Sequence, residues 1–285
     1  MSFLPGLQKF EKFELGAGVL LEHLWLFLES KGGLSSEAIA LFQACVVPMA
    51  FFYIYGVFLF LVDTYSSEGF KSKYKIQNTI RITSDDYKEG FRVSVINWLF
   101  VALPYLSFCC FYVQPRYSNV SFGPTNYPSV YTFMRDIVIS LVIEDFLFYS
   151  THRLLHLPAL YKLIHKQHHT FTAPFGIAAI YAHPIEHFLS NVLPLSVGPL
   201  LLNCHPSFMM IWGVVALFNT MTVHSGYCLP IPGFPEPYFH DYHHEKFNEC
   251  FGAARIFDTL FGTCKGFNAA YAKGLLQVPR TIKKE

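Results

Sequence analysis

The sequence predicts an all-α integral membrane protein with about four transmembrane helices and a cytosolic, histidine-rich helical cap. Three observations lead to this class. Hydrophobic residues make up 52% of the 285 residues and charged residues only 14%, whereas soluble domains usually carry about 25% charged residues. Two uncharged stretches are long enough to cross a bilayer. Of the 13 histidines, 12 lie between residues 152 and 244.

The remaining composition supports a membrane protein and excludes other classes. The mean hydropathy is +0.32, and the 30 Phe and 17 Tyr suit lipid-facing helices with aromatic anchors near the headgroups. The net charge of +1 predicts no nucleic-acid partner. The seven cysteines have no C-x-x-C spacing, so we expect reduced, structural thiols. We expect no removable signal peptide.

The membrane segments are predicted in chain order. The apolar run at 19–28 contains Glu22 and His23 and predicts an interfacial helix. Residues 38–62 and 93–113 carry no charge and predict two firm spans. Residues 137–150 are apolar but include two carboxylates. Residues 188–202 and 208–223 are short for full spans and predict a tilted hairpin.

Basic residues set the expected orientation, because cytosolic loops are enriched in lysine and arginine. The segment between the two firm spans contains Lys71, Lys73, Lys75, Arg81, Lys88 and Arg92. The next loop has only Arg116, together with a glycosylation sequon at Asn119 that fits a lumenal position. All histidine-rich segments then face the cytosol. We divide the chain into a membrane region at 1–130, a histidine-bearing region at 131–265 and a cytosolic tail at 266–285, and we expect them to fold as one structural unit.

Three histidine groups have regular spacing. The first is H-x3-H and the other two are H-x2-H-H, which places two or three imidazoles on one helix face. Neutral imidazole binds iron, copper, zinc or nickel. Eight imidazoles exceed the needs of one ion with about four to six ligands, so two ions are expected. The eight are His152, His156, His165, His168, His169, His240, His243 and His244.

Other polar residues have weaker assignments. Glu144 and Asp145 precede the first group and either orient a ligand imidazole or mark a helix end that meets water. Asp241 and Glu186 have the same two interpretations, with the helix-surface one favoured. His187 either orients a ligand imidazole or has a structural role. A lone solvated or core histidine is the simpler interpretation for His23 and His205. A structural zinc site stays open, while the absence of H-E-x-x-H argues against a zinc protease.

The three histidine groups around a membrane hairpin resemble the fatty acid hydroxylase and sterol desaturase superfamily. Residues 173–177 (Ala-Pro-Phe-Gly-Ile), 181–186 (Tyr-Ala-His-Pro-Ile-Glu), 223–227 (Val-His-Ser-Gly-Tyr) and 261–263 (Phe-Gly-Thr) are similar to C-4 methylsterol monooxygenases. Residues 181–187 and 239–248 resemble still more closely the fatty acid hydroxylase domain-containing protein 2 subgroup. The likeness covers about residues 130–265. Phe239 departs from it, because those sterol oxidases carry a further histidine there.

The resemblance implies a hydroxylase-type catalytic region and a dimetal centre of iron with ligands beyond the three groups. The matching positions are His183 and His224, which brings the implied set to ten. It also implies residence in the endoplasmic reticulum membrane and electrons from NADH through cytochrome b5 and its reductase. No Gly-rich dinucleotide motif or C-x-x-C-H haem motif occurs in the sequence, which favours an external donor.

The function expected from these features is O2-dependent monooxygenation of a sterol C-4 methyl group in lipid biosynthesis. Hydroxylation of a sterol side chain or a fatty acyl chain would use the same ligands. A histidine-rich metal-binding or transport protein is a different class, and it predicts ionisable residues inside the spans; residues 38–62 and 93–113 have none. A catalytically silent regulator is the last alternative. Ligand type alone does not separate iron from zinc.

Overall fold

The computed structural model describes residues 21–117, 123, 127–229, 231, 233 and 235–276. Within these ranges every regular element is a helix, and one isolated β-bridge joins Lys75 to Tyr227. The predicted all-α class is therefore confirmed. The sequon at Asn119 and the part of the tail beyond residue 276 lie outside the described residues.

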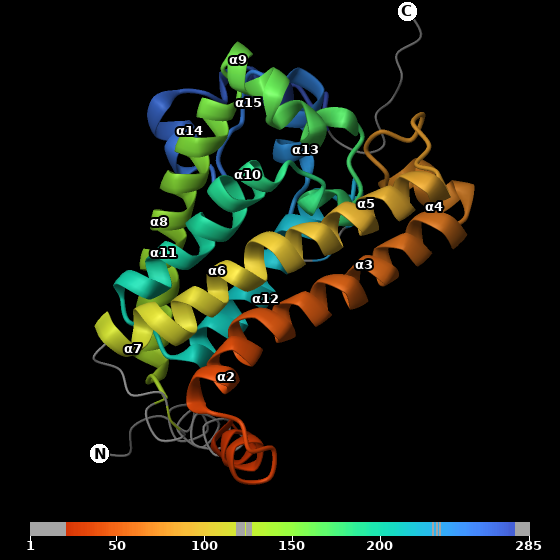
Figure 1. Ribbon diagram of the computed structural model, residues 1–285. Helices are drawn as coiled ribbons and strands as arrows, with labels where there is room; N and C mark the ends of the chain where they lie inside the picture. Colours follow the sequence, from red (N-terminus) through yellow and green to blue (C-terminus); the bar gives the residue numbers. More distant parts are fainter. Residues whose placement is uncertain are drawn as a thin grey trace, which may run out of the picture.

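Two long helical rods follow a helix at residues 21–30 (Figure 1). The first, Ser36–Tyr65, runs continuously through α2, η1 and α3, and the second, Ser84–Tyr117, runs through α5, η2, α6, η3 and α7. A short helix, α4, lies between them. The bounds are α2 Ser36–Leu41, η1 Phe42–Val46, α3 Val47–Tyr65, α4 Glu68–Tyr74, α5 Ser84–Asn97, η2 Trp98–Ala102, α6 Leu103–Phe108, η3 Cys109–Val113 and α7 Gln114–Tyr117.

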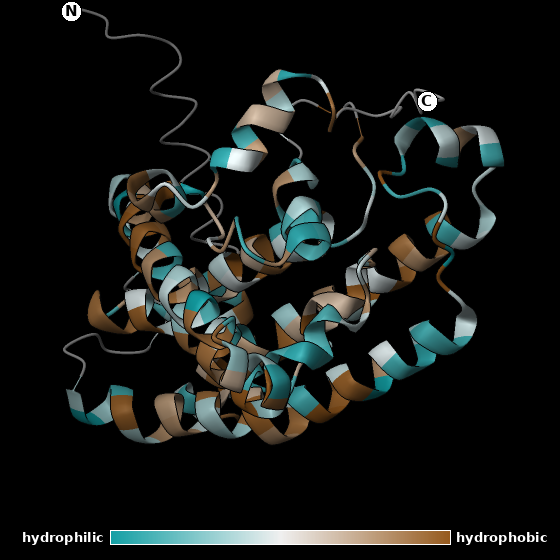
Figure 2. Cartoon of the chain, turned by 90° about the horizontal axis from the view of Figure 1, so that it is seen from above, coloured by the Kyte–Doolittle hydropathy of each residue, from teal (hydrophilic) through white to brown (hydrophobic). Residues whose placement is uncertain are grey.

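The second half contains two long helices, α8 and α12, and several short ones that gather at one end of the molecule (Figure 1). The bounds are α8 Val130–Leu155, α9 Pro158–Leu163, η4 His165–Thr170, η5 Gly176–Ile180, α10 Pro184–Glu186, η6 His187–Val192, α11 Leu193–Leu201, α12 Pro206–Val223, α13 Tyr238–Lys246, α14 Ile256–Phe261 and α15 Lys265–Ala272. The long helices carry most of the hydrophobic residues in Figure 2.

Four prolines inside the long helices follow wide π-helical turns. Each lies two residues after a π-helical turn ends: Pro48 after η1, Pro104 after η2, Pro115 after η3 and Pro194 after η6. A proline has no backbone N–H, and its ring clashes with the carbonyl one turn earlier. The extra residue in a π turn widens the helix at that carbonyl. The helices therefore continue through these prolines.

Polar caps define where the helices begin. The Thr83 side chain accepts from the backbone N–H of Asp86, and the Asp86 side chain accepts from the N–H of Thr83, which forms a capping box at the start of α5. Ser35 and Ser129 cap α2 and α8 in a simpler way, each accepting one backbone N–H. These caps position the first turns of the rods and of the histidine-bearing α8.

The core is formed where the segment at 175–182 inserts between the two rods. Ile177 packs against Gly56 of α3 and Gly90 of α5, and a Cβ atom at Gly90 would lie 2.9 Å from it. Asn97 is fully buried, and its side-chain amide donates to the carbonyls of Ile180 (3.1 Å) and Ala182 (2.9 Å). The rods therefore hold the loop that follows the second histidine group in a fixed place.

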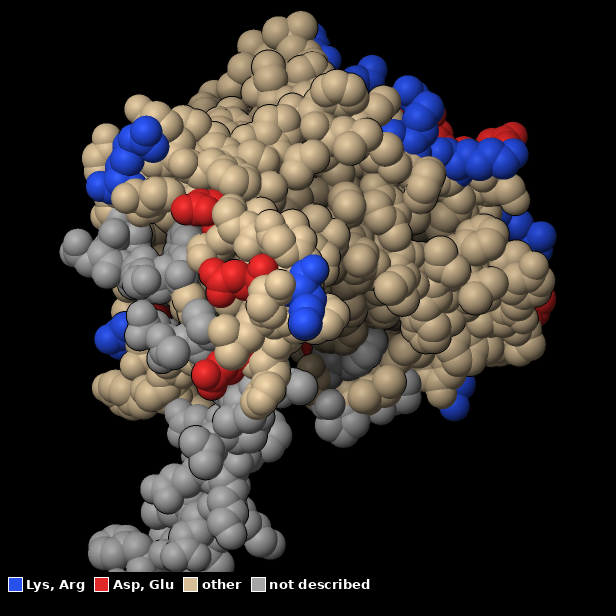
Figure 3. All heavy atoms as spheres, turned by 60° about the horizontal axis from the view of Figure 1, so that its bottom comes forward, with Lys and Arg blue, Asp and Glu red and all other residues tan. Residues whose placement is uncertain are grey.

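Three helices are long and apolar enough to cross a membrane within the described ranges: Ser36–Tyr65, Ser84–Tyr117 and Pro206–Val223. The two firm spans expected from the sequence lie inside the first two. Residues 137–150 lie in α8, and residues 188–202 lie mostly in η6 and α11, neither of which meets the same criteria. Figure 3 shows a broad face without charged side chains, with most charges toward its edges. The expected total of about four spans stays a prediction.

Candidate metal centre

Nine buried or partly buried histidines meet where α8, η4, α12 and α13 come together. They form two groups, and within each group the candidate ligand atoms all lie within 4.8 Å of one another. We call them the five-histidine group and the four-histidine group. The first contains His152, His156, His165, His169 and His243, and the second contains His168, His224, His240 and His244.

Each H-x2-H-H motif divides its imidazoles between the two groups. In α13, His240 and His244 are four residues apart and share a helix face, while His243 points to the other group. The same division occurs in η4, a 3₁₀ helix, where His168 joins the four-histidine group. A single motif therefore contributes to both groups, so the two candidate sites are neighbours.

Backbone carbonyl groups fix the tautomer of four of these histidines. A carbonyl oxygen only accepts hydrogen bonds, so the Nδ1 atom that faces it carries the proton and Nε2 keeps a free lone pair. The donors and acceptors are His152 with Phe251 (2.7 Å), His243 with Glu249 (2.7 Å), His224 with Thr220 (2.8 Å) and His244 with Phe171 (3.1 Å).

The Nε2 atoms then face one another at short distances. The His152 and His165 Nε2 atoms are 3.1 Å apart, and those of His224 and His240 are 2.8 Å apart. Facing lone pairs repel unless a cation lies between them. Neutral imidazoles converging through Nε2, with Nδ1 held by a carbonyl or carboxylate, are a common metal-binding arrangement. The residues present therefore fit two metal ions.

Burial keeps these imidazoles neutral. It lowers the pKa of His165 to about 3, of His168 to about 4 and of His224 to about 3, because a charged ring is poorly solvated there. The neighbouring imidazoles lower the pKa of His244 further. A metal ligand must be deprotonated. The groups are therefore ready to bind cations at neutral pH.

Glu186 is the carboxylate that orients a histidine of this centre. Its Oε1 atom lies 2.8 Å from Nδ1 of His165, and both side chains are buried. Burial raises the pKa of Glu186 to about 8. A cation on Nε2 of His165 would oppose that shift, because it favours the charged carboxylate. The sequence interpretation favoured a helix-surface role for Glu186 and was wrong; its position three residues after His183 gave no signal of the contact.

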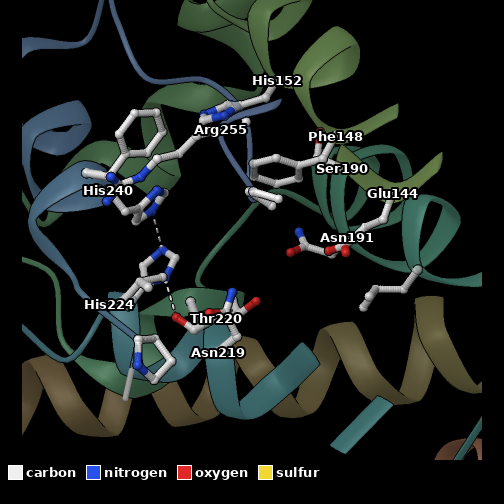
Figure 4. Close-up of a pocket in the computed structure, with 18 of the residues that line it drawn as sticks. Glu144, Phe148, His152, Ser190, Asn191, Asn219, Thr220, His224, His240 and Arg255 are labelled. Carbon is white, nitrogen blue, oxygen red and sulfur yellow. Dashed lines mark hydrogen bonds between the residues drawn. The ribbon is translucent and has the colours of Figure 1, made fainter. Parts of the chain in front are cut away.

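Asp145 acts on the centre through a loop. Its carboxylate accepts the backbone N–H groups of Ala254 (2.6 Å) and Phe257 (3.1 Å). This loop also contains Phe251, whose carbonyl accepts from His152. Asp145 therefore supports the loop that positions His152. Glu144 instead lines the cavity described below, across from His224 and His240 (Figure 4).

The structure places three other predicted residues outside the two groups. Nδ1 of His183 accepts the N–H of Ile185 and caps α10, and His183 lies in neither group, so the ten-histidine set implied by the resemblance stays a prediction. His187 is buried and lines a second cavity. Asp241 is buried and accepts from the side-chain amide of Gln77 (3.0 Å), which ties α13 to the segment after α4.

A cavity of about 220 Å³ reaches both histidine groups. His152 and His165 of the five-histidine group line it, as do His168, His224 and His240 of the four-histidine group. In Figure 4, His224 and His240 lie on one side and Glu144 and Asn191 on the other. The cavity therefore gives a substrate direct access to both candidate sites.

A second, largely apolar cavity of about 80 Å³ adjoins the first. Asn191, Leu195 and Thr220 line both cavities, so the two share a wall. Trp98 and Trp212, from the second rod and from α12, line the apolar part. An elongated, mostly apolar molecule fits this shape, with one end at the histidines and the other among the membrane helices.

Comparison with known proteins agrees with this site. A family model described as fatty acid hydroxylase matches residues 137–263. Fatty acid hydroxylase domain-containing protein 2 of Macaca fascicularis is 40% identical over 241 residues, which cover 82% of this chain and 70% of that protein. The chain belongs to the fatty acid hydroxylase family. The resemblance expected from the motifs is thereby confirmed for the family and for this subgroup.

Other relatives in the fatty acid hydroxylase family differ in the lipid that their names give. Methylsterol monooxygenase 1 of Gallus gallus is 30% identical over 290 residues, covering 99% of this chain and 92% of that protein. Fatty acid hydroxylase ahd1 of Mycosarcoma maydis is 32% identical and covers 76% of this chain and 55% of that protein. No solved structure matches this chain.

Proposed function

We propose that this protein is a membrane-bound di-iron monooxygenase that oxidises a C-4 methyl group of a sterol. The observation that carries the proposal is the cavity that reaches both histidine groups and continues into an apolar compartment. Membership of the fatty acid hydroxylase family and the methylsterol monooxygenase relatives support lipid oxidation. The indole rings of Trp98 and Trp212, which line the apolar cavity, suit a rigid apolar ring system.

The overall reaction balances with external electrons. One dioxygen molecule, two electrons and two protons convert the methyl group into a hydroxymethyl group and one water. Two bound iron ions supply the redox chemistry that activates dioxygen. We propose that the nine histidines hold them, five for one ion and four for the other. Repetition of the reaction would carry the methyl group to the carboxylic acid.

The chain's own residues orient the ligand imidazoles and bind the lipid. The Glu186 carboxylate lies beside Nδ1 of His165, and the carbonyl of Phe251 accepts the Nδ1 proton of His152, so both Nε2 atoms face the centre. The apolar cavity excludes water and holds the body of the lipid. Asn191 and Thr220, at the wall common to both cavities, are polar groups that can orient a hydroxyl of the lipid near the reacting carbon.

Location and electron supply follow the same proposal. The protein would reside in the endoplasmic reticulum membrane with the histidine groups facing the cytosol. Electrons would come from NADH through cytochrome b5 and its reductase. In that arrangement the lipid reaches the cavity from the bilayer, while the reductant approaches from the aqueous side.

The test uses the full chain in microsomes with NADH, oxygen and a 4-methylsterol, and detects oxidised sterol by mass spectrometry. His168→Ala and His244→Ala should abolish product and lower iron content, because each removes a group ligand. His183→Asn is the matched control, since Asn keeps a capping side chain and His183 lies outside both groups. It should retain iron and activity.

The outcomes separate the candidate substrates. Oxidised C-4 product from the wild-type protein and from His183→Asn alone supports the proposal. A protein that carries two iron ions but leaves the sterol unchanged would overturn the sterol assignment. Hydroxylated acyl chains from the same microsomes would then assign the fatty acyl substrate, which the name of the Mycosarcoma maydis relative suggests.

A further inference from the structure

Exposed leucines gather where α8 turns into α9 and η4. We call residues 153–166 the α9 corner. Leu154 is 50% exposed, Leu157 is 53% exposed and Leu163 is 76% exposed. Figure 1 places α9 at the end of the molecule opposite α2 and α7, beyond the ends of the long rods. Exposed apolar side chains in this position, outside the three candidate spans, suit contact with a protein partner.

The α9 corner is also basic. Arg153, Lys162 and Lys166 are exposed around the three leucines. No Asp or Glu occurs in the sequence between Asp145 and Glu186, so the whole segment that builds the corner carries only positive charge at neutral pH. An apolar centre with a charged rim is the usual composition of a transient protein interface. Its charge selects an acidic partner.

Tyr161 connects the corner to the metal centre. Its ring centroid lies 5.7 Å from that of His156, 6.0 Å from that of His165 and 5.9 Å from that of His169. All three belong to the five-histidine group. Lys162 and Leu163 directly follow Tyr161 in the chain. A protein bound at the corner is therefore separated from the imidazoles by a single aromatic side chain.

We propose that the α9 corner is the docking surface for the electron donor, an acidic protein that carries one electron at a time. This inference rests on the proposed function, which consumes two external electrons per dioxygen. Each docking event would oxidise one donor molecule and deliver one electron to a metal held by the five-histidine group, so two events would supply the two electrons that one turnover consumes. Small interfaces of this kind are typical of electron-transfer partners, which must dissociate after each transfer.

The experiment measures electron transfer directly and needs no lipid product. The soluble haem domain of cytochrome b5 is the probe, reduced beforehand, and its re-oxidation by the metal-loaded full chain is followed through the haem absorbance. The double variant Lys162→Glu/Lys166→Glu should slow re-oxidation at least about tenfold at low ionic strength, because repulsion replaces steering. Leu163→Asp should also slow it. Added salt should slow the wild-type reaction.

Lys73→Glu is the control, because it makes one such lysine-to-glutamate exchange at an exposed position of α4, which Figure 1 places away from α9. It should transfer electrons at the wild-type rate. A small chemical reductant should reduce the metal of all variants equally. Equal rates for the α9-corner and Lys73 variants would overturn the proposal. A loss with the chemical reductant as well would place the effect at the metal centre and also overturn it. Electron transfer without any sterol oxidation would reject only the proposed substrate.

Discussion

At the scale of single residues, Glu186 decides how firmly His165 is held. Replacing it with Ala removes the carboxylate that lies 2.8 Å from His165 Nδ1, and loss of such a partner typically lowers metal affinity by about 10- to 100-fold. Glu186→Ala should therefore lose iron to a competing chelator at a correspondingly lower chelator concentration. Glu186→Gln keeps an accepting oxygen of similar reach, so the chelator concentration at which it loses iron should lie between the values for the wild type and Glu186→Ala. If Glu186→Ala retained iron as firmly as the wild-type protein, Glu186 would not be orienting His165.

Residue spacing predicts part of this centre. The eight regularly spaced histidines all lie in the two groups, because helical periodicity determines which side chains share a face. His224, implied by the resemblance alone, lies with them, at the C-cap of α12. His183 and Glu186 show what residue spacing does not predict. They lie on the same short helix, and only the packing of that helix against η4 determines that Glu186, and not His183, reaches the imidazoles.

At the scale of elements, Asp145 fastens the loop at 251–257 to α8. Asp145→Ala removes the acceptor of two partly buried backbone donors, those of Ala254 and Phe257, and a hydrogen bond to a charged group typically contributes about 1.5–3 kcal/mol. The variant should unfold at a lower temperature, measured by a thermal shift in detergent. Its iron should be released first, because the loop also holds His152. The control Asp85→Ala removes a fully exposed carboxylate in α5 and should leave both unchanged.

Hydropathy predicted where the long helices lie but not how they are built. The rods extend beyond residues 38–62 and 93–113 because polar first and last turns continue each helix outside the apolar stretch. The wide turns before Pro48, Pro104 and Pro194 have no hydropathy signal. They form because each proline lacks a backbone N–H and clashes with the carbonyl one turn earlier, and the pattern of apolar residues does not reveal this. The 3₁₀ form of η4 was likewise not predicted, since its histidine spacing suits an α-helix equally well.

At the scale of the whole molecule, the three candidate spans place the metal centre on one side of the membrane. The first, Ser36–Tyr65, has 30 residues and is about 45 Å long at about 1.5 Å per residue, so it crosses a core of about 30 Å with tilt. α3 ends, α5 begins and α12 ends toward the histidines. The basic residues around α4 lie on that side, so we predict from the positive-inside rule that it faces the cytosol.

Cysteine labelling tests this orientation. Thr79 is exposed between α4 and α5, and Tyr117 is 74% exposed at the opposite end of the second rod. In sealed microsomes a membrane-impermeant maleimide should label Thr79→Cys at once, and Tyr117→Cys only after detergent is added. Six of the seven native cysteines are buried and the seventh is partly buried, so the unmodified chain gives the background. Labelling of Tyr117→Cys in intact vesicles, with Thr79→Cys protected, would place the histidines in the lumen. Cytosolic cytochrome b5 could then not dock at the α9 corner, so this experiment also tests the electron supply.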